Sequence, residues 1–299
     1  MKDNRKLKLF IILVFIVSFL FAGICYLIWP GQTRLVGMPY MFMPMICAMI
    51  IQKLVYKESL RLNISFKFNR WFLVAWLTPL FLGFGAIGIA LLMPDISYST
   101  EMEGMMGLFS QTMPPEAVEQ MKEQLSTLPL NPVILTAISG LIAGLTINGF
   151  FGFGEEYGWR GFMLGQLRKM SYAKASLLIG TVWGFWHAPL VLQGHNYPEH
   201  PVIGVFMMVV WCILLTFLFN YVTIKSRSVI ATSIMHGSLN GTAGVGMMLL
   251  SGGNDLTIGV TGLAGFIALA IVIAGFYFYD TKISKEKIMY GKIGDYIKL

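Results

Sequence analysis

The chain has 299 residues, of which 56% are hydrophobic and only 12% are charged. Because ordinary soluble domains carry about 25% charged residues, this composition excludes a soluble globular protein. The apolar residues gather in stretches of roughly 20, the length that a helix needs to cross about 30 Å of hydrocarbon. The sequence therefore predicts an all-α, polytopic integral membrane protein with the lipid bilayer as its solvent.

About eight transmembrane helices are predicted, forming a single membrane domain over residues 1–299. The first apolar run follows a basic start, but it exceeds the roughly 7–15 residues of a signal-peptide core and lacks a small-residue cleavage site. We therefore expect a retained first helix. The predicted spans cover residues 9–29, 37–52, 71–93, 133–155, 176–193, 202–223, 229–250 and 257–278.

Lysine and arginine are divided unevenly between the two sides of the membrane. With both termini inside, the cytoplasmic segments hold 20 of the 22 basic residues, and only Arg34 and Lys122 lie outside. Since basic residues are retained on the cytoplasmic side, we predict cytoplasmic termini and cytoplasmic loops at 53–70, 160–175 and 224–228, in the cell membrane. The net charge of +7 is then a topology signal, with attraction to anionic lipid, and requires no nucleic-acid partner.

Two outer segments carry further features. Residues 94–131 are acidic and Met-rich, and Pro115 predicts a short helix that begins at a proline. We interpret this segment mainly as a solvated loop, the alternative being a cap or a substrate entrance. His195 and His200 could bind a metal, but we expect no site there, because their predicted side is opposite the end that carries the polar motifs.

The first polar motif, GEEYGWRG, lies at the cytoplasmic end of the fourth span, and apolar residues resume at Phe162. The fourth helix can therefore continue through the charges and hold both carboxylates below the membrane surface. On a helix Glu156 and Arg160 are four residues apart and can pair. Glu155 projects about 100° away from them and is expected to stay free for chemistry.

Two further motifs place imidazoles within spans. His187 lies about 11 residues from the cytoplasmic end of the fifth span, some 16 Å deep. His236 and Asn240 share a face of the seventh span, with His236 roughly 10 Å deep. A charge at a helix centre costs about 2.5–3.5 kcal/mol on insertion scales, so these groups should face one another. They could merely hold helices together, but a carboxylate, two imidazoles and an amide also suit peptide-bond hydrolysis.

The runs GEEYGWRG, WGFWHAPL and ATSIMHGSLN resemble the motifs EExxxR, FxxxH and HxxxN of the CPBP family. That family includes the CAAX prenyl endopeptidases, the bacteriocin-processing and immunity-type Abi proteins, and related intramembrane proteases. The resemblance covers about residues 130–250, which would form the catalytic core. Trp183 stands where the family usually has Phe, giving WxxxH, and we expect this change to alter packing more than chemistry.

The resemblance implies roles for the motif residues. Glu155 and His187 would activate a water molecule, with Glu155 as the general base. His236 and Asn240 would donate hydrogen bonds to the developing oxyanion.

Glu156 and Arg160 would orient the site and hold the helix end. A metalloprotease is equally compatible with the residues, because Glu155, His187 and His236 could hold zinc with an open position for water. The sequence leaves these two mechanisms open.

The predicted function is therefore an intramembrane endopeptidase that cuts a membrane-associated protein or peptide, with no implication that the substrate is prenylated. The alternative is a catalytically idle family member that acts as a bacteriocin-immunity or partner-binding membrane protein. A transporter fits poorly, because the sequence shows neither an inverted repeat nor a broken helix pair of the kind usual in transporters. The intact motifs favour the protease.

Overall fold

The computed structural model describes residues 3–60, 64–110, 113–127 and 130–297. The described chain is mainly helical, which confirms the predicted all-α class; the only strands in these ranges, β1 and β2, have two residues each and pair antiparallel. In chain order the elements are α1 (Asp3–Ile28), α2 (Thr33–Tyr40), α3 (Met43–Met49), η1 (Ile50–Val55), α4 (Arg70–Ala90), β1 (Ser97–Tyr98), α5 (Glu103–Ser110), α6 (Pro115–Ser126), α7 (Pro132–Leu145), α8 (Ile147–Glu156), η2 (Tyr157–Met163), α9 (Leu164–Gln166), α10 (Tyr172–Trp186), α11 (Ala188–Val191), α12 (Pro201–Ser226), α13 (Val229–Thr242), α14 (Val245–Met248), β2 (Leu250–Ser251), α15 (Leu263–Phe278), η3 (Tyr279–Ile283), η4 (Ile288–Tyr290) and α16 (Ile293–Tyr296).

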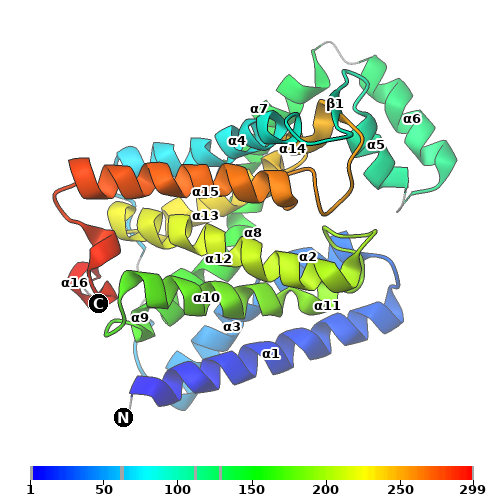
Figure 1. The fold of residues 1–299 in the computed structure, drawn as a ribbon. Helices are drawn as coiled ribbons and strands as arrows, with labels where there is room; N and C mark the ends of the chain where they lie inside the picture. Colours follow the sequence, from blue (N-terminus) through cyan, green and yellow to red (C-terminus); the bar gives the residue numbers. More distant parts are fainter. Residues whose placement is uncertain (1–2, 61–63, 111–112, 128–129, 298–299) are drawn as a thin grey trace.

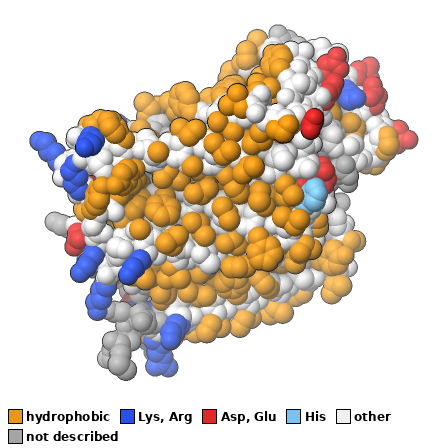
Figure 2. All heavy atoms as spheres, viewed as in Figure 1, with side chains coloured by type: hydrophobic (Ala, Val, Ile, Leu, Met, Phe, Trp, Pro, Cys, Tyr) orange, Lys and Arg blue, Asp and Glu red, His pale blue; other side chains and the backbone are white. Residues whose placement is uncertain are grey.

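The long helices form one bundle whose two ends differ in charge. Both termini lie at one end, and α5 and α6 lie at the other (Figure 1). Lys and Arg side chains gather at the end with the termini, acidic side chains gather near α5 and α6, and apolar side chains cover the face between them (Figure 2). This segregation agrees with the predicted charge map. Of the basic residues in that map, Lys2, Arg61, Lys298 and the side chain of Arg34 lie outside the described residues.

Five described helices are long and apolar enough to cross a membrane, or six if a bent helix pair counts as one span. The helices that precede His187 and contain His236, α10 and α13, have only 15 and 14 residues. The chain is an integral, multi-pass membrane protein, and the number of eight spans stays a prediction. The five helices cover Arg5–Ile28, Leu35–Val55, Arg70–Ala90, Pro201–Ser226 and Leu263–Ile283.

The fourth predicted span is broken, which corrects the expectation of one straight helix over 133–155. The segments Pro132–Leu145 and Ile147–Gln166 meet at a bend of 53°. At the bend, Thr146 leaves the helical conformation, with φ −124° and ψ −110°. The bend needs a glycine at position 149, because a Cβ there would collide with the Gly144 carbonyl oxygen. Transporters usually have a second such break in the other half of the chain, and the described residues contain one bent pair.

The outer segment is folded, which corrects its interpretation as a solvated loop. Helix α6 begins at Pro115, as predicted, and β1 pairs with β2. Helix α5 packs against α14 and β2, and Gly104 lies against the Leu250 carbonyl. Met106 and Val118 are only 5% and 8% exposed. These buried contacts make the segment a cap on the end of the bundle opposite the termini.

Helix α13 lies inside the bundle and packs against α4, α7, α8 and α12. Its glycines allow very close approach: a Cβ on Gly237 would strike the α8 backbone at Gly149, and one on Gly241 would strike the α7 backbone at Gly140. Small residues at such contacts let helix backbones come together in a membrane. This packing brings His236 beside the carboxylates at the end of α8.

Candidate active site

The first motif lies on a helix that continues without interruption, as predicted. Helix α8 ends at Glu156, the π-helical segment η2 carries Arg160, and the helix runs on to Gln166. Glu155 is 11 residues from Gln166, about 16 Å along the axis. Glu155, Glu156 and Arg160 are 2%, 0% and 1% exposed, so all three charges are buried within the bundle.

Glu156 is the centre of a buried ion-pair network. Its Oε1 lies 3.1 Å from Arg160 Nη1, which is the pair that the spacing of four predicts. The same oxygen lies 2.8 Å from His236 Nδ1, which joins the first motif to the third. Arg160 Nη2 donates to Thr216 Oγ1 at 3.1 Å, and its guanidinium lies 4.9 Å from the Phe219 ring centroid. Glu156 and Arg160 thus fix the orientation of His236.

Glu155 is held at one oxygen by Trp183. Trp183 Nε1 donates to Glu155 Oε2 at 2.6 Å, while Glu155 Oε1 lies 3.8 Å from His236 Nε2. The expectation that Glu155 stays free needs correction, because one of its oxygens has a partner. Trp183 thus makes a hydrogen bond to the site in addition to its packing, and phenylalanine could not make it because it has no side-chain N–H. The remaining oxygen is available to a water molecule.

His187 follows α10, whose start is capped by the Ser171 side chain accepting from the Lys174 N–H at 3.4 Å. Its Nδ1 lies 2.8 Å from the carbonyl oxygen of Trp183. A carbonyl can only accept, so we assign the proton of the neutral ring to Nδ1, which leaves a lone pair on Nε2. The ring packs against Trp186, with centroids 4.8 Å apart. His187 is therefore fixed in a form that can accept a proton from water.

Four of the six motif residues meet at one cavity of about 430 Å³. Glu155, His187, His236 and Asn240 all line it, as the cost of isolated polar groups predicts. Helix α13, which supplies the last two, starts where Ser228 Oγ accepts from the Ile230 N–H at 3.2 Å. His236 is 4% exposed, whereas Asn240 is exposed at the cavity's side.

The cavity also has a lining that the sequence analysis missed. Asn148 lies seven residues before Glu155, two helical turns away on the same face, so the spacing could have indicated it. Tyr40 lines the cavity and donates to the Trp186 carbonyl at 2.7 Å, and Trp211 joins them from α12. Neither has a spacing signal relative to the motifs, because α2 and α12 reach the site only through tertiary packing.

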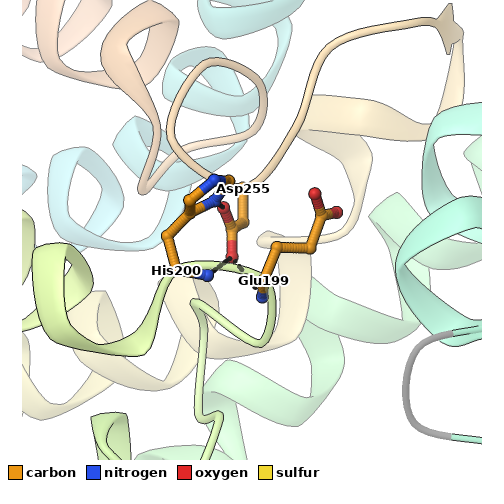
Figure 3. A group of neighbouring side chains, drawn as sticks. All are labelled: Glu199, His200 and Asp255. Carbon is orange, nitrogen blue, oxygen red and sulfur yellow. Dashed lines mark hydrogen bonds and ion pairs between the residues drawn. The ribbon is translucent and has the colours of Figure 1, made fainter.

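The two outer-loop histidines are placed apart from each other. His195 lines the cavity together with the motif residues, and its predicted side of the membrane stays a prediction. His200 instead pairs with Asp255, Nδ1 to Oδ1 at 2.6 Å (Figure 3). Asp255 Oδ2 accepts the backbone N–H groups of Glu199 and His200 at 2.7 and 3.1 Å. The Asp255 carboxylate thereby ties the loop at residues 249–262 to the start of α12.

The buried charges of the inner network nearly balance. Glu155 and Glu156 contribute two negative charges and Arg160 contributes one positive charge, so neutrality requires one further proton. Either His236 Nε2 or Glu155 Oε1 can hold that proton, because these atoms face each other at 3.8 Å. A charge left uncompensated in this interior would be costly. A neutral network therefore has one proton on His236 Nε2 or on Glu155 Oε1, beside the cavity.

The zinc hypothesis can be compared with these distances. Both imidazoles have the outer partners typical of metal ligands, a carboxylate for His236 and a carbonyl for His187. Among the described residues, however, Glu199, His200 and Asp255 are the three whose ligand atoms all lie within 4.8 Å of one another. Glu155, His187 and His236 do not form such a group, so we derive no catalytic step through a metal.

The fold and the site together define an integral, multi-pass membrane protein with carboxylates and imidazoles converging on a cavity inside its helices. Residues 128–242, which include all six motif residues, match the family described as type II CAAX prenyl endopeptidase Rce1-like. The CAAX prenyl protease 2 of Methanococcus maripaludis is 31% identical over 144 residues, which make up 45% of this chain and 48% of that protein. The chain thus matches about half the length of this curated relative. Over the matched range the chain is therefore similar to CAAX prenyl endopeptidases, in agreement with the resemblance of its three motifs to the CPBP family.

Proposed function

We propose that the chain is an intramembrane endopeptidase that hydrolyses a peptide bond in a membrane-associated protein or peptide. The observation that carries this proposal is the convergence of Glu155, His187, His236 and Asn240 on one cavity. We also propose that the chain is one membrane domain with its catalytic core at residues 130–250, located in the cell membrane with cytoplasmic termini. The charge segregation between the bundle ends supports that orientation.

In the proposed reaction, a water molecule binds between Glu155 Oε1 and His187 Nε2. The water oxygen attacks the scissile carbonyl carbon while Glu155 Oε1 takes its proton. The developing oxyanion accepts hydrogen bonds from His236 Nε2–H and the Asn240 side-chain N–H. The carbon–nitrogen bond then breaks as Glu155 returns the proton to the leaving nitrogen, which yields a carboxyl and an amine end. Glu156 and Arg160 keep His236 in its donating orientation.

A zinc ion on Glu155, His187 and His236 is the other form of this proposal, in which the metal would supply Lewis-acid activation of water. A chelation experiment distinguishes the mechanism without a metal from the mechanism with zinc. With direct activation, cleavage by the purified protein stays within about twofold after treatment with EDTA or 1,10-phenanthroline. Loss of cleavage that added zinc restores would favour the metal form.

The name of the archaeal relative suggests a first substrate to test. Protein reconstituted in nanodiscs would be mixed with a quenched fluorescent CAAX peptide, farnesylated or unmodified, with Glu155→Gln as the control. We expect cleavage by the wild-type protein only, and comparison of the two peptides tells whether the substrate needs a prenyl group. Equal cleavage by wild type and Glu155→Gln would contradict the proposed function. Specific binding without cleavage of the native substrate would favour the idle, partner-binding alternative.

A further inference from the structure

We propose that Trp183 is a positioning residue that holds the general base Glu155 and the imidazole of His187 in the relative positions that the reaction needs. The inference rests on the proposed function, because it assigns Trp183 a task at the same site. Trp183 is 1% exposed and uses both its polar groups there: the indole N–H donates to Glu155 Oε2 at 2.6 Å, and the backbone carbonyl accepts from His187 Nδ1 at 2.8 Å. One residue therefore fixes both groups that face the water.

The indole N–H holds Glu155 without neutralising it. An arginine partner would compensate the carboxylate and reduce its ability to take a proton, whereas a neutral donor leaves the negative charge in place. Arg160 is kept from that role by two contacts. It pairs with Glu156 at 3.1 Å, and its guanidinium lies 4.4 Å from the centroid of the Trp183 ring. The ring thus binds the cation on its face and the base at its edge.

The donor also selects which oxygen of Glu155 acts. With Oε2 bound to Trp183, Oε1 is the atom that faces His236 and the cavity. A carboxylate fixed by one oxygen loses the freedom to rotate, so its second oxygen stays at the position that the water needs. A phenylalanine at position 183, the residue of the FxxxH pattern, would keep the aromatic packing but would release this oxygen. The inference is thus specific to the WxxxH form of the motif.

Trp76 on α4 provides a control outside the cavity. Its indole N–H donates to the Leu141 carbonyl oxygen at 2.8 Å, as the Trp183 indole N–H donates to Glu155 Oε2 at 2.6 Å. Trp76 is partly buried and is not among the residues that line the cavity. Phenylalanine at either position removes one indole hydrogen bond and the same volume. Only the change at 183 removes a hydrogen bond to Glu155.

The experiment measures kcat and KM separately for Trp183→Phe and Trp76→Phe, on the CAAX peptide that the wild-type protein cleaves. We expect Trp183→Phe to lower kcat about 10- to 100-fold with KM within about threefold. The change disturbs the alignment of Glu155 with the attacking water and leaves the binding of the substrate intact. Trp76→Phe should keep kcat within about threefold, because its indole hydrogen bond is to Leu141 and not to a cavity residue. On a Glu155→Gln background, Trp183→Phe should cause no further loss, since both changes act through one carboxylate.

A second variant separates the hydrogen bond from packing. Replacing Trp183 by 3-benzothienylalanine keeps the two-ring shape but exchanges the N–H for sulfur, and it should reproduce the kcat loss of Trp183→Phe. The inference fails if the benzothienyl variant keeps wild-type kcat, or if both phenylalanine variants lower kcat equally. In those outcomes Glu155→Gln would still abolish cleavage, so the proposed function would stand. Normal cleavage by Glu155→Gln would overturn the function itself.

Discussion

Two clusters in this molecule contain the same residue types but differ in what their polar atoms do. In the inner cluster, Glu155 and His187 each use one atom for a protein partner and leave another facing the cavity. In the outer cluster, both oxygens of Asp255 are taken by His200 and by the backbone at the start of α12. A cluster of carboxylates and imidazoles therefore indicates a catalytic site only where each group has one polar atom bound to the protein and another free to react.

The largest expected effect is at the inner carboxylate. Glu155→Gln keeps the size of the side chain but cannot take a proton from water, so cleavage should fall about 10²- to 10⁴-fold. Glu199→Gln, the same change in the outer cluster, should leave the rate within about twofold. Rates would be measured on equal amounts of folded protein. Similar losses in the two variants would remove the distinction between the clusters.

Arg160→Ala tests the buried ion pair that supports the inner cluster. Removing the cation leaves Glu156 without its compensating charge, and breaking such a buried pair costs about 3–5 kcal/mol. We expect lower yield and a reduced unfolding temperature in detergent as well as slow cleavage. Arg168→Ala is the matched control, because Arg168 is exposed at the helix end. A normally stable Arg160→Ala protein would show that the pair is not needed for folding.

Asn240→Ala probes the proposed oxyanion donor. Loss of one such donor typically costs about 10²- to 10³-fold in kcat. Asn148→Ala is a suitable comparison, because Asn148 lines the same cavity while its amide nitrogen donates to the Gly237 carbonyl at 3.3 Å. We expect it to cost less than about 10-fold. Equal losses would mean that both residues serve only to shape the cavity.

The smallest effect on catalysis is expected from Asp255→Ala. This change leaves two backbone N–H groups and His200 without their acceptor, so stability should fall by about 1–3 kcal/mol while kcat is retained. Thermal unfolding and cleavage assays on one preparation would measure both quantities. A divalent cation that raises the unfolding temperature of the wild type, but not of Asp255→Ala, would instead identify the outer cluster as a metal site.

The sequence predicts features that depend on local spacing. Helical class, charge segregation, the Glu156–Arg160 pair and the continuation of the helix past Glu156 all follow from composition or from neighbours within one turn. The bond between Glu156 and His236 joins residues 80 positions apart, so its existence depends on how α13 packs against α8. The indole donor at Trp183 was missed because an aromatic residue in an apolar span is usually judged by its size. The bend at Thr146 and the folded outer segment likewise arise from tertiary contacts.

The central claim, that Glu155 and His187 perform peptide-bond hydrolysis, can be tested most directly without choosing a substrate. Membranes from cells that produce the wild type, Glu155→Gln or His187→Ala at equal levels would be compared by mass spectrometry of protein termini. The account predicts at least one new terminus in a membrane-associated protein that appears with the wild type and is absent from both variants. If either variant yields the same termini as the wild type, these residues are not the catalytic groups.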